Sequence, residues 1–136
     1  MARADMAARG FGPGQTARLT GTRATYVRLR PSPRPAGQIG LDPVTAENAG
    51  LTEGATAQID PAPLAALDHA LLRLDKGREA TPEDLREALF DMSLTAGDRL
   101  DLTLPLGRRV GCTVVEIGAG TAGLVQEDTQ VTVEMP

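Results

Sequence analysis

Two ten-residue stretches, GFGPGQTARL at residues 10–19 and GLTEGATAQI at residues 50–59, decide how the first half of this chain folds. They align without gaps at a spacing of forty residues, with four identical positions: Gly10/Gly50, Gly14/Gly54, Thr16/Thr56 and Ala17/Ala57. Each stretch has one glycine where a short helix would end, a second glycine in a tight turn, and then an alternating strand. Two such copies within sixty residues predict a pseudo-twofold β-barrel built from interleaved halves.

A short helix is expected before each copy of the repeat. Asp42 is a good N-cap and Pro43 suits the first helical position, which predicts a helix over 44–49 that ends at Gly50. The equivalent helix, over 5–9, is expected to end at Gly10. Residues 37–41 predict a strand that leads into the second copy. Its counterpart forty residues earlier would precede Met1, so we expect the barrel to lack its first strand.

The second half begins after a stiff Pro-Ala-Pro connection at residues 61–63, which predicts two domains, 1–63 and 64–136. Leucines at 64, 67, 71 and 74 have helical spacing, and periodicity alone predicts a helix over 64–74. Thr81, Pro82 and Asp84 predict the start of another helix, which runs to about Phe90. Strands are expected over 99–104, 109–117 and 124–134, and residues 94–102 repeat the apolar, turn, glycine and strand pattern loosely.

Composition narrows the class of protein. The 136 residues include three aromatic side chains and no tryptophan, so any core must be aliphatic. Fifteen glycines and ten prolines favour short strands joined by turns. No apolar run approaches twenty residues, and the polar N-terminus does not resemble a signal peptide. Because Cys112 is the single cysteine, no internal disulfide can form, and we expect a cytoplasmic protein without membrane contacts.

Charge is distributed unevenly along the chain. Residues 1–36 carry seven arginines against one acid, whereas residues 37–136 carry seven basic residues against seventeen acids. The basic stretch is most simply a solvated strand surface. Nucleic acid is an unlikely partner, because Tyr26 alone among these arginines could stack on a base.

The sequence motifs that commonly indicate a catalytic or cofactor-binding site are better explained by structural roles in this chain. Residues 118–123, GAGTAG, match a dinucleotide fingerprint, but the residues after them alternate as a strand and predict a hairpin loop. The sole lysine, Lys76, is outside any P-loop sequence, and one His69 with one Cys112 cannot build a typical zinc site. The acids of the helix at Thr81 need no role beyond the helix dipole. We therefore predict no catalytic residue, cofactor or metal.

The repeat unit, the connection at 61–63 and three short blocks together resemble the N-terminal domain of valosin-containing-protein-type AAA ATPases. The blocks are LTAGD at 94–98, VVE at 114–116 and QEDT at 126–129. The resemblance covers nearly the whole chain. It implies a mainly β protein with short helices: a double-psi β-barrel over 1–63, without its first strand, and a small four-stranded β-barrel over 64–136. It also implies a strand over 70–74, against the helical periodicity, and we adopt the strand there.

In this family the N-domain is not an enzyme. It recruits adaptor and substrate proteins in a cleft between its two lobes, at the edge of a hexameric ATPase ring. By position, the resemblance implies that the cleft residues are Val27, Leu29, Leu67, Leu89 and Phe90. Eukaryotic members carry aromatic side chains where this chain has Leu67 and Leu89, so we expect different adaptors. The leading hypothesis is a prokaryotic member of the family.

Three alternatives remain open. The chain could be a free-standing double-psi-barrel module that binds proteins, a barrel enzyme, or an anion-binding domain that uses the basic stretch. Self-processing decarboxylases of the barrel class need a Gly-Ser cleavage site, but Ser32 and Ser93 follow Pro31 and Met92.

Overall fold

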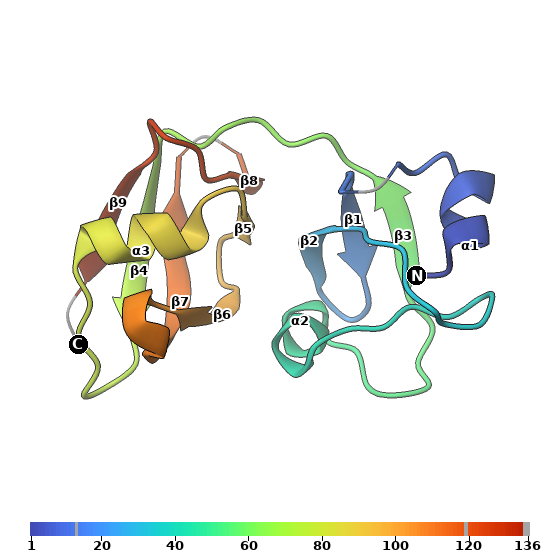
Figure 1. Cartoon of the computed structure of the whole chain (residues 1–136), viewed down its shortest axis with the longest axis horizontal. Helices are drawn as coiled ribbons and strands as arrows, with labels where there is room; N and C mark the ends of the chain where they lie inside the picture. The colour runs from blue at the N-terminus through green and yellow to red at the C-terminus, as the bar shows by residue number, and fades with distance from the viewer. Residues whose placement is uncertain (13, 119, 135–136) are drawn as a thin grey trace. The chain divides into compact units, whose positions relative to one another are not determined.

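The computed structural model describes residues 1–12, 14–118 and 120–134, so Pro13 of the repeat and Ala119 of the glycine motif lie outside the described residues. The protein is mainly β, with 36% strand and 18% helix. It divides into two compact units, Met1–Pro63 and Leu64–Pro136 (Figure 1). Each unit has its own core cluster of apolar side chains.

The first unit is a three-stranded antiparallel sheet with two short helices. Its strands are β1 (Thr16–Thr20), β2 (Ala24–Arg28) and β3 (Gln58–Pro61), in the order β2-β1-β3. The helices are α1 (Arg3–Ala8) and α2 (Pro43–Ala49). Ala17 of β1 lies in the core of this unit, together with buried side chains from outside the strand. These core residues are Met1, Met6, Phe11, Ala17 and Leu29, with Val27, Ile39 and Ile59 packed against them.

The predicted caps of the two helices are present. The Asp42 side chain accepts a hydrogen bond of 2.8 Å from the Thr45 amide, and Gly50 ends α2 with a left-handed φ of 65°. Gly10 follows α1 with a φ of 76°. Three backbone hydrogen bonds of the first copy also recur forty residues later. Met6 N to Ala2 O corresponds to Ala46 N to Asp42 O, and Phe11 N to Met6 O corresponds to Leu51 N to Ala46 O. Gln15 N to Gly12 O corresponds to Ala55 N to Thr52 O. The sequence repeat is therefore also a repeat of backbone structure.

The two copies of the repeat pair with each other. Leu19 of β1 lies opposite Ile59 of β3, and these two residues occupy the same position in their copies. On either side, Arg18 pairs with Asp60 and Thr20 pairs with Gln58. At forty-residue spacing Arg18 is equivalent to Gln58, and Thr20 is equivalent to Asp60. Exchanging the two copies therefore converts one flanking pair into the other. The β1–β3 register is thus locally twofold about the Leu19–Ile59 pair.

The strand predicted over residues 37–41 is absent, so this prediction was wrong. Gly37 occupies a turn with a φ of 80°, and its amide donates a 2.7 Å hydrogen bond to the Asp5 carboxylate. The Arg34 side chain packs so closely on Gly40 that a Cβ there would crowd the guanidinium. Side-chain contacts therefore hold this segment in an irregular path. Since the inference of a missing first strand depended on this strand, the repeat no longer predicts one.

The second unit contains a four-stranded sheet in the order β6-β7-β4-β9. Its strands are β4 (His69–Leu74), β6 (Arg99–Thr103), β7 (Arg109–Ile117) and β9 (Gln130–Glu134). β4 pairs parallel with β9 and antiparallel with β7. Two short strands, β5 (Ser93–Thr95) and β8 (Ala122–Leu124), form a separate pair, while α3 (Pro82–Leu89) contacts β9 and β6. A 3-10 turn, Pro105–Gly107, joins β6 to β7.

The helix that periodicity predicts over 64–74 is wrong, and the strand implied by the family resemblance is confirmed over Ala70 to Leu74. Ala70, Leu72 and Leu74 are buried at alternate positions, whereas Arg73 between them is exposed. β4 lies between two partner strands, so it satisfies its backbone groups on both edges. Tertiary pairing of this kind overrides a local helical preference.

The final third of the chain differs in part from its prediction. β7 has the predicted bounds, but the segment predicted as one strand over 124–134 is divided into β8 and β9 by a turn at 126–129. Gly123 was expected in a hairpin loop and instead lies in β8, opposite Leu94. A Cβ at Gly123 would collide with Leu67, so glycine is required there by close packing.

Cys112 is buried in β7 beside an ion pair. The Arg99 guanidinium donates to both carboxylate oxygens of Asp75, at 2.7 and 3.0 Å, and these bonds lower the pKa of Asp75. Gly111 leaves room for this carboxylate, because a Cβ there would collide with it. Burial raises the pKa of the Cys112 thiol from its ordinary value of 9.0 to about 11, and the charge of Asp75 adds to the shift.

This raised pKa predicts a loss of stability at alkaline pH. Between pH 9 and 11 the unfolded chain ionises its thiol while the folded chain keeps the proton, so the free energy of unfolding falls as pH rises. The slope from this group is at most about 1.4 kcal/mol per pH unit. Urea unfolding of the wild type and of Cys112→Ala at several pH values measures the slope. An equally steep fall in Cys112→Ala would contradict the assignment.

The two helix-ending glycines predict unequal costs of substitution. Alanine at either position adopts an unfavourable left-handed φ, which costs about 1–2 kcal/mol. At Gly50 the added Cβ would also collide with the Thr22 hydroxyl, whereas at Gly10 it meets nothing within 4 Å. Gly50→Ala should therefore destabilise the first unit more than Gly10→Ala, and adding Thr22→Ala should recover part of the difference. Fluorescence of Tyr26, the single tyrosine, follows unfolding of this unit; equal losses would refute the prediction.

Candidate functional site

The structure distributes the five residues of the predicted cleft between the two units. Leu29 is buried in the first core and Val27 packs against it, while Leu67 and Leu89 belong to the second core. Phe90 differs from the other four, because 49% of its surface is exposed. The cleft itself stays a prediction, and Phe90 is the member of the set that is most accessible to another molecule within its own unit.

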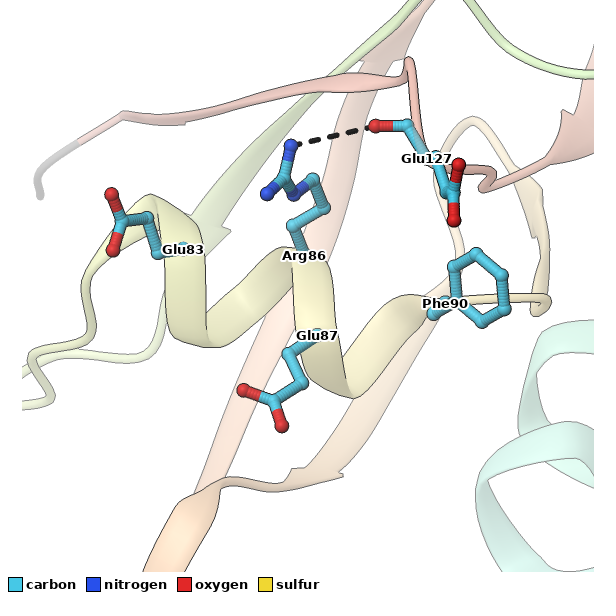
Figure 2. Close-up of a pocket in the computed structure, with 5 residues that line it drawn as sticks. All are labelled: Glu83, Arg86, Glu87, Phe90 and Glu127. Carbon is cyan, nitrogen blue, oxygen red and sulfur yellow. Dashed lines mark hydrogen bonds between the residues drawn. The ribbon is translucent and has the colours of Figure 1, made fainter.

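Phe90 borders an open hollow of about 670 Å³ on the second unit (Figure 2). Four of the lining residues come from α3 and its C-terminus at positions i, i+3, i+4 and i+7, so they follow one stripe of the helix. The fifth lining residue comes from the turn between β8 and β9. The lining residues are Glu83, Arg86, Glu87, Phe90 and Glu127.

Capping and burial fix which stripe of α3 faces outward. The Thr81 side chain caps the helix by accepting a hydrogen bond of 3.1 Å from the Asp84 amide, and Pro82 begins the helix as predicted. Leu85 and Leu89, one turn apart, are both completely buried in the second core. The stripe that lines the hollow is therefore held at the surface by the packing of these two leucines.

The turn that carries Glu127 is held by the hydroxyl of Thr129. This hydroxyl accepts a 2.9 Å hydrogen bond from the Gln126 amide and donates a 2.7 Å bond to the Leu67 carbonyl. Thr129 is 1% exposed, and its bond to the Leu67 carbonyl is buried. The Arg86 guanidinium reaches across to donate to the Glu127 carbonyl oxygen, at 3.4 Å (Figure 2). The Arg86 bond thus links the helix to the turn across the hollow.

The residue after Phe90 is tied to the same turn. Asp91 has a left-handed φ of 65°, an uncommon conformation for a residue with a side chain. Its amide donates to the Val125 carbonyl at 2.7 Å, and its carboxylate accepts a 3.2 Å bond from the Gln126 side chain. These bonds compensate the backbone cost and fix the direction in which Phe90 leaves the helix.

The hollow is acidic. Glu83, Glu87 and Glu127 are all exposed, and no ion pair within residues 1–12, 14–118 and 120–134 reaches their carboxylates. Glu83 and Glu87 are one turn apart, a spacing at which like charges repel. Arg86 is the single basic residue of the lining, and one of its nitrogens is already bonded to Glu127.

Comparison with known proteins adds no relatives. No protein-family model matches the chain, and no curated protein matches it either. Within the described part of the chain, no helix combines the length and apolar character that crossing a membrane requires. The same part contains no group of three or more histidine, cysteine or acidic side chains that could hold a metal ion.

Sequence reasoning found part of the hollow. Phe90 was predicted as a binding residue, and the acids of α3 were recognised but interpreted as partners of the helix dipole. Glu127 belongs to the QEDT block, where the sequence pointed to a turn and not to its packing against a helix. The signal that could have found the site is the i, i+3, i+4, i+7 stripe from Glu83 to Phe90, which ends in an aromatic residue instead of a polar one.

Thr129 provides a test of how the turn is held. Thr129→Val keeps the shape of the side chain but leaves the buried Leu67 carbonyl without its donor and the Gln126 amide without its acceptor. The second unit should lose about 1–3 kcal/mol of unfolding free energy. Thr132→Val, at an exposed position of β9, is the matched control and should cost much less. Thermal unfolding followed by circular dichroism compares them, and similar losses would argue against a special role for the Thr129 hydroxyl.

Proposed function

We propose that this chain is the non-catalytic N-domain of a valosin-containing-protein-type AAA ATPase, or a close relative of such a domain. In this proposal the first unit is a double-psi β-barrel and the second a small four-stranded barrel. The pair recruits adaptor or substrate proteins for an ATPase ring that unfolds them. The ring belongs either to the same polypeptide or to a separate hexamer.

The observation that carries the proposal is the pairing of the two repeat copies. A double-psi barrel is built from two related halves that interleave, so equivalent strands must meet about a twofold axis. The Leu19–Ile59 pair, with its flanking pairs exchanged by the repeat, supports such an arrangement. The hydrogen bonds that recur at forty-residue spacing support the same duplication.

The second unit supports the proposal in a different way. The segment around Ala70 forms a strand although its leucine spacing favours a helix, and the family resemblance had implied that strand. The blocks at 94–98, 114–116 and 126–129 fall on β5 and its turn, on β7, and on the turn before β9. The three blocks that carried the resemblance thus lie on defined elements of one unit.

An affinity purification of the native gene product, tagged at its own locus, tests the proposal. We expect a large assembly that contains a P-loop ATPase, in the same polypeptide or as a partner, and retains adaptor proteins. Native mass spectrometry identifies the ATPase and counts its subunits. A protein recovered repeatedly without any P-loop ATPase, in the presence or absence of ATP, would refute the ATPase-linked role.

The same experiment separates the alternatives. A free-standing protein-binding module would co-purify with specific proteins but no ATPase. A nucleic-acid-binding or anion-binding domain would carry nucleic acid that dissociates steeply as salt is raised.

A further inference from the structure

We infer that the hollow on the second unit, lined by α3 and Glu127, is a docking site for a basic, partly apolar peptide segment of a partner protein. The inference rests on the proposed recognition function and specifies where and how one kind of partner is held. The hollow belongs to the second unit alone, so it requires no contribution from the first.

The charge of the hollow selects a cation. Three carboxylates, those of Glu83, Glu87 and Glu127, surround it without an ion pair among the described residues, against one arginine. Because Glu83 and Glu87 repel each other, a positive group placed near both relieves that repulsion. The second unit as a whole carries thirteen acids against seven basic residues, so its field adds to the attraction.

The geometry of the carboxylates indicates an extended cation. They are spaced along the helix and across to the turn, and the described residues contain no acidic group compact enough for a metal ion. Two arginine or lysine side chains in one segment could reach separate carboxylates. A peptide with basic residues at alternate positions has this reach.

Phe90 adds an apolar requirement. Its ring is half exposed in a chain where Phe11, the other phenylalanine, is 5% exposed. The face of an exposed ring attracts a cationic head by cation–π interaction and packs against the aliphatic stem of arginine or lysine. An adjacent leucine on the peptide would cover the rest of the ring. Phe90 therefore distinguishes a basic peptide with apolar side chains from a purely polar polycation.

The bonds around the hollow make it preformed. Thr129 fixes the turn, Arg86 joins the turn to α3, and Asp91 fixes the start of the next segment. A site whose backbone is already held loses less entropy on binding than one that must fold around its partner. We therefore expect a modest but measurable affinity, with a dissociation constant on the order of 0.1–1 mM for a short peptide.

A titration of the full, ¹⁵N-labelled chain with three hexapeptides tests the inference. The first is Gly-Arg-Leu-Arg-Leu-Gly, the second replaces its leucines by serine, and the third replaces its arginines by glutamate. The first should shift the amides of α3 and of residues 126–129 and should bind more weakly as salt is raised. The second should bind about tenfold more weakly, and the third should not bind.

Matched variants locate the contact. Phe90→Ser should weaken the first peptide about tenfold, and Glu83→Gln combined with Glu87→Gln should weaken it at least about fivefold and reduce its salt dependence. Leu106→Ser, at an exposed leucine outside the hollow, and Glu116→Gln, at an exposed acid on β7, should leave binding unchanged. Circular dichroism confirms that each variant is folded before its affinity is compared.

The remaining outcomes would each overturn the inference. One is the absence of shifts in α3 with the first peptide at millimolar concentration. Another is equal binding of spermidine with no effect of Phe90→Ser, which would show a general polycation surface. A third is dimerisation of the chain through this hollow in preference to peptide. Any of these rejects the peptide site, whereas the proposed ATPase-linked role stands or falls separately on the native purification.

Discussion

Both cores of this protein must be assembled mainly from aliphatic side chains, because the chain has three aromatic residues and no tryptophan, and only the first core contains a ring, that of Phe11. The second core meets this constraint with leucines and valines from α3 and from the sheet, among which Leu72, Leu85 and Val114 are completely buried. Aliphatic cores gain their stability from many small contacts, so backbone elements have to approach closely. Gly123 permits such an approach, because a Cβ there would collide with the Leu67 side chain and crowd the Ala65 carbonyl. Because aromatic side chains are so scarce, the half-exposed ring of Phe90 is a strong candidate for a binding residue.

Local rules predicted the elements whose signals are local. The caps at Asp42 and Thr81, the glycine stops at Gly10 and Gly50 and the bounds of β7 follow from side-chain chemistry and alternation within each segment. The predictions were wrong where contacts with distant segments determine the local structure. β4 is a strand because β7 and β9 pair with both of its edges. Residues 37–41 are irregular because Asp5 accepts a hydrogen bond from the Gly37 amide and Arg34 packs on Gly40. The hollow depends on the packing of Glu127 beside α3, which no single segment encodes.

The repeat connects sequence to structure in the first unit more directly than any other feature. Equivalent helices end at equivalent glycines, and equivalent strands then pair with each other about Leu19 and Ile59. The copies have nevertheless diverged at their caps, since Ala2 stands where Asp42 caps the second helix and forms no side-chain bond. The Met1 amino group bonds to Ser32, and the Ala2 bridge to Ser32 adds support at this end. Contacts outside the repeat thus support the copy whose own cap is weaker.

Under the proposed function, the protein must release what it recruits, and a weak, partly electrostatic site suits that role. At physiological salt, charges on the surface act over about 8 Å, so carboxylates around the hollow attract a basic segment only when it is close. One contact of this kind would discriminate poorly between partners. If several copies of the chain surround one ring, as the proposed function implies, each further contact becomes intramolecular and raises the overall affinity without any new interaction. Selectivity would then depend on the number and spacing of basic segments in the partner and not on the strength of any one of them.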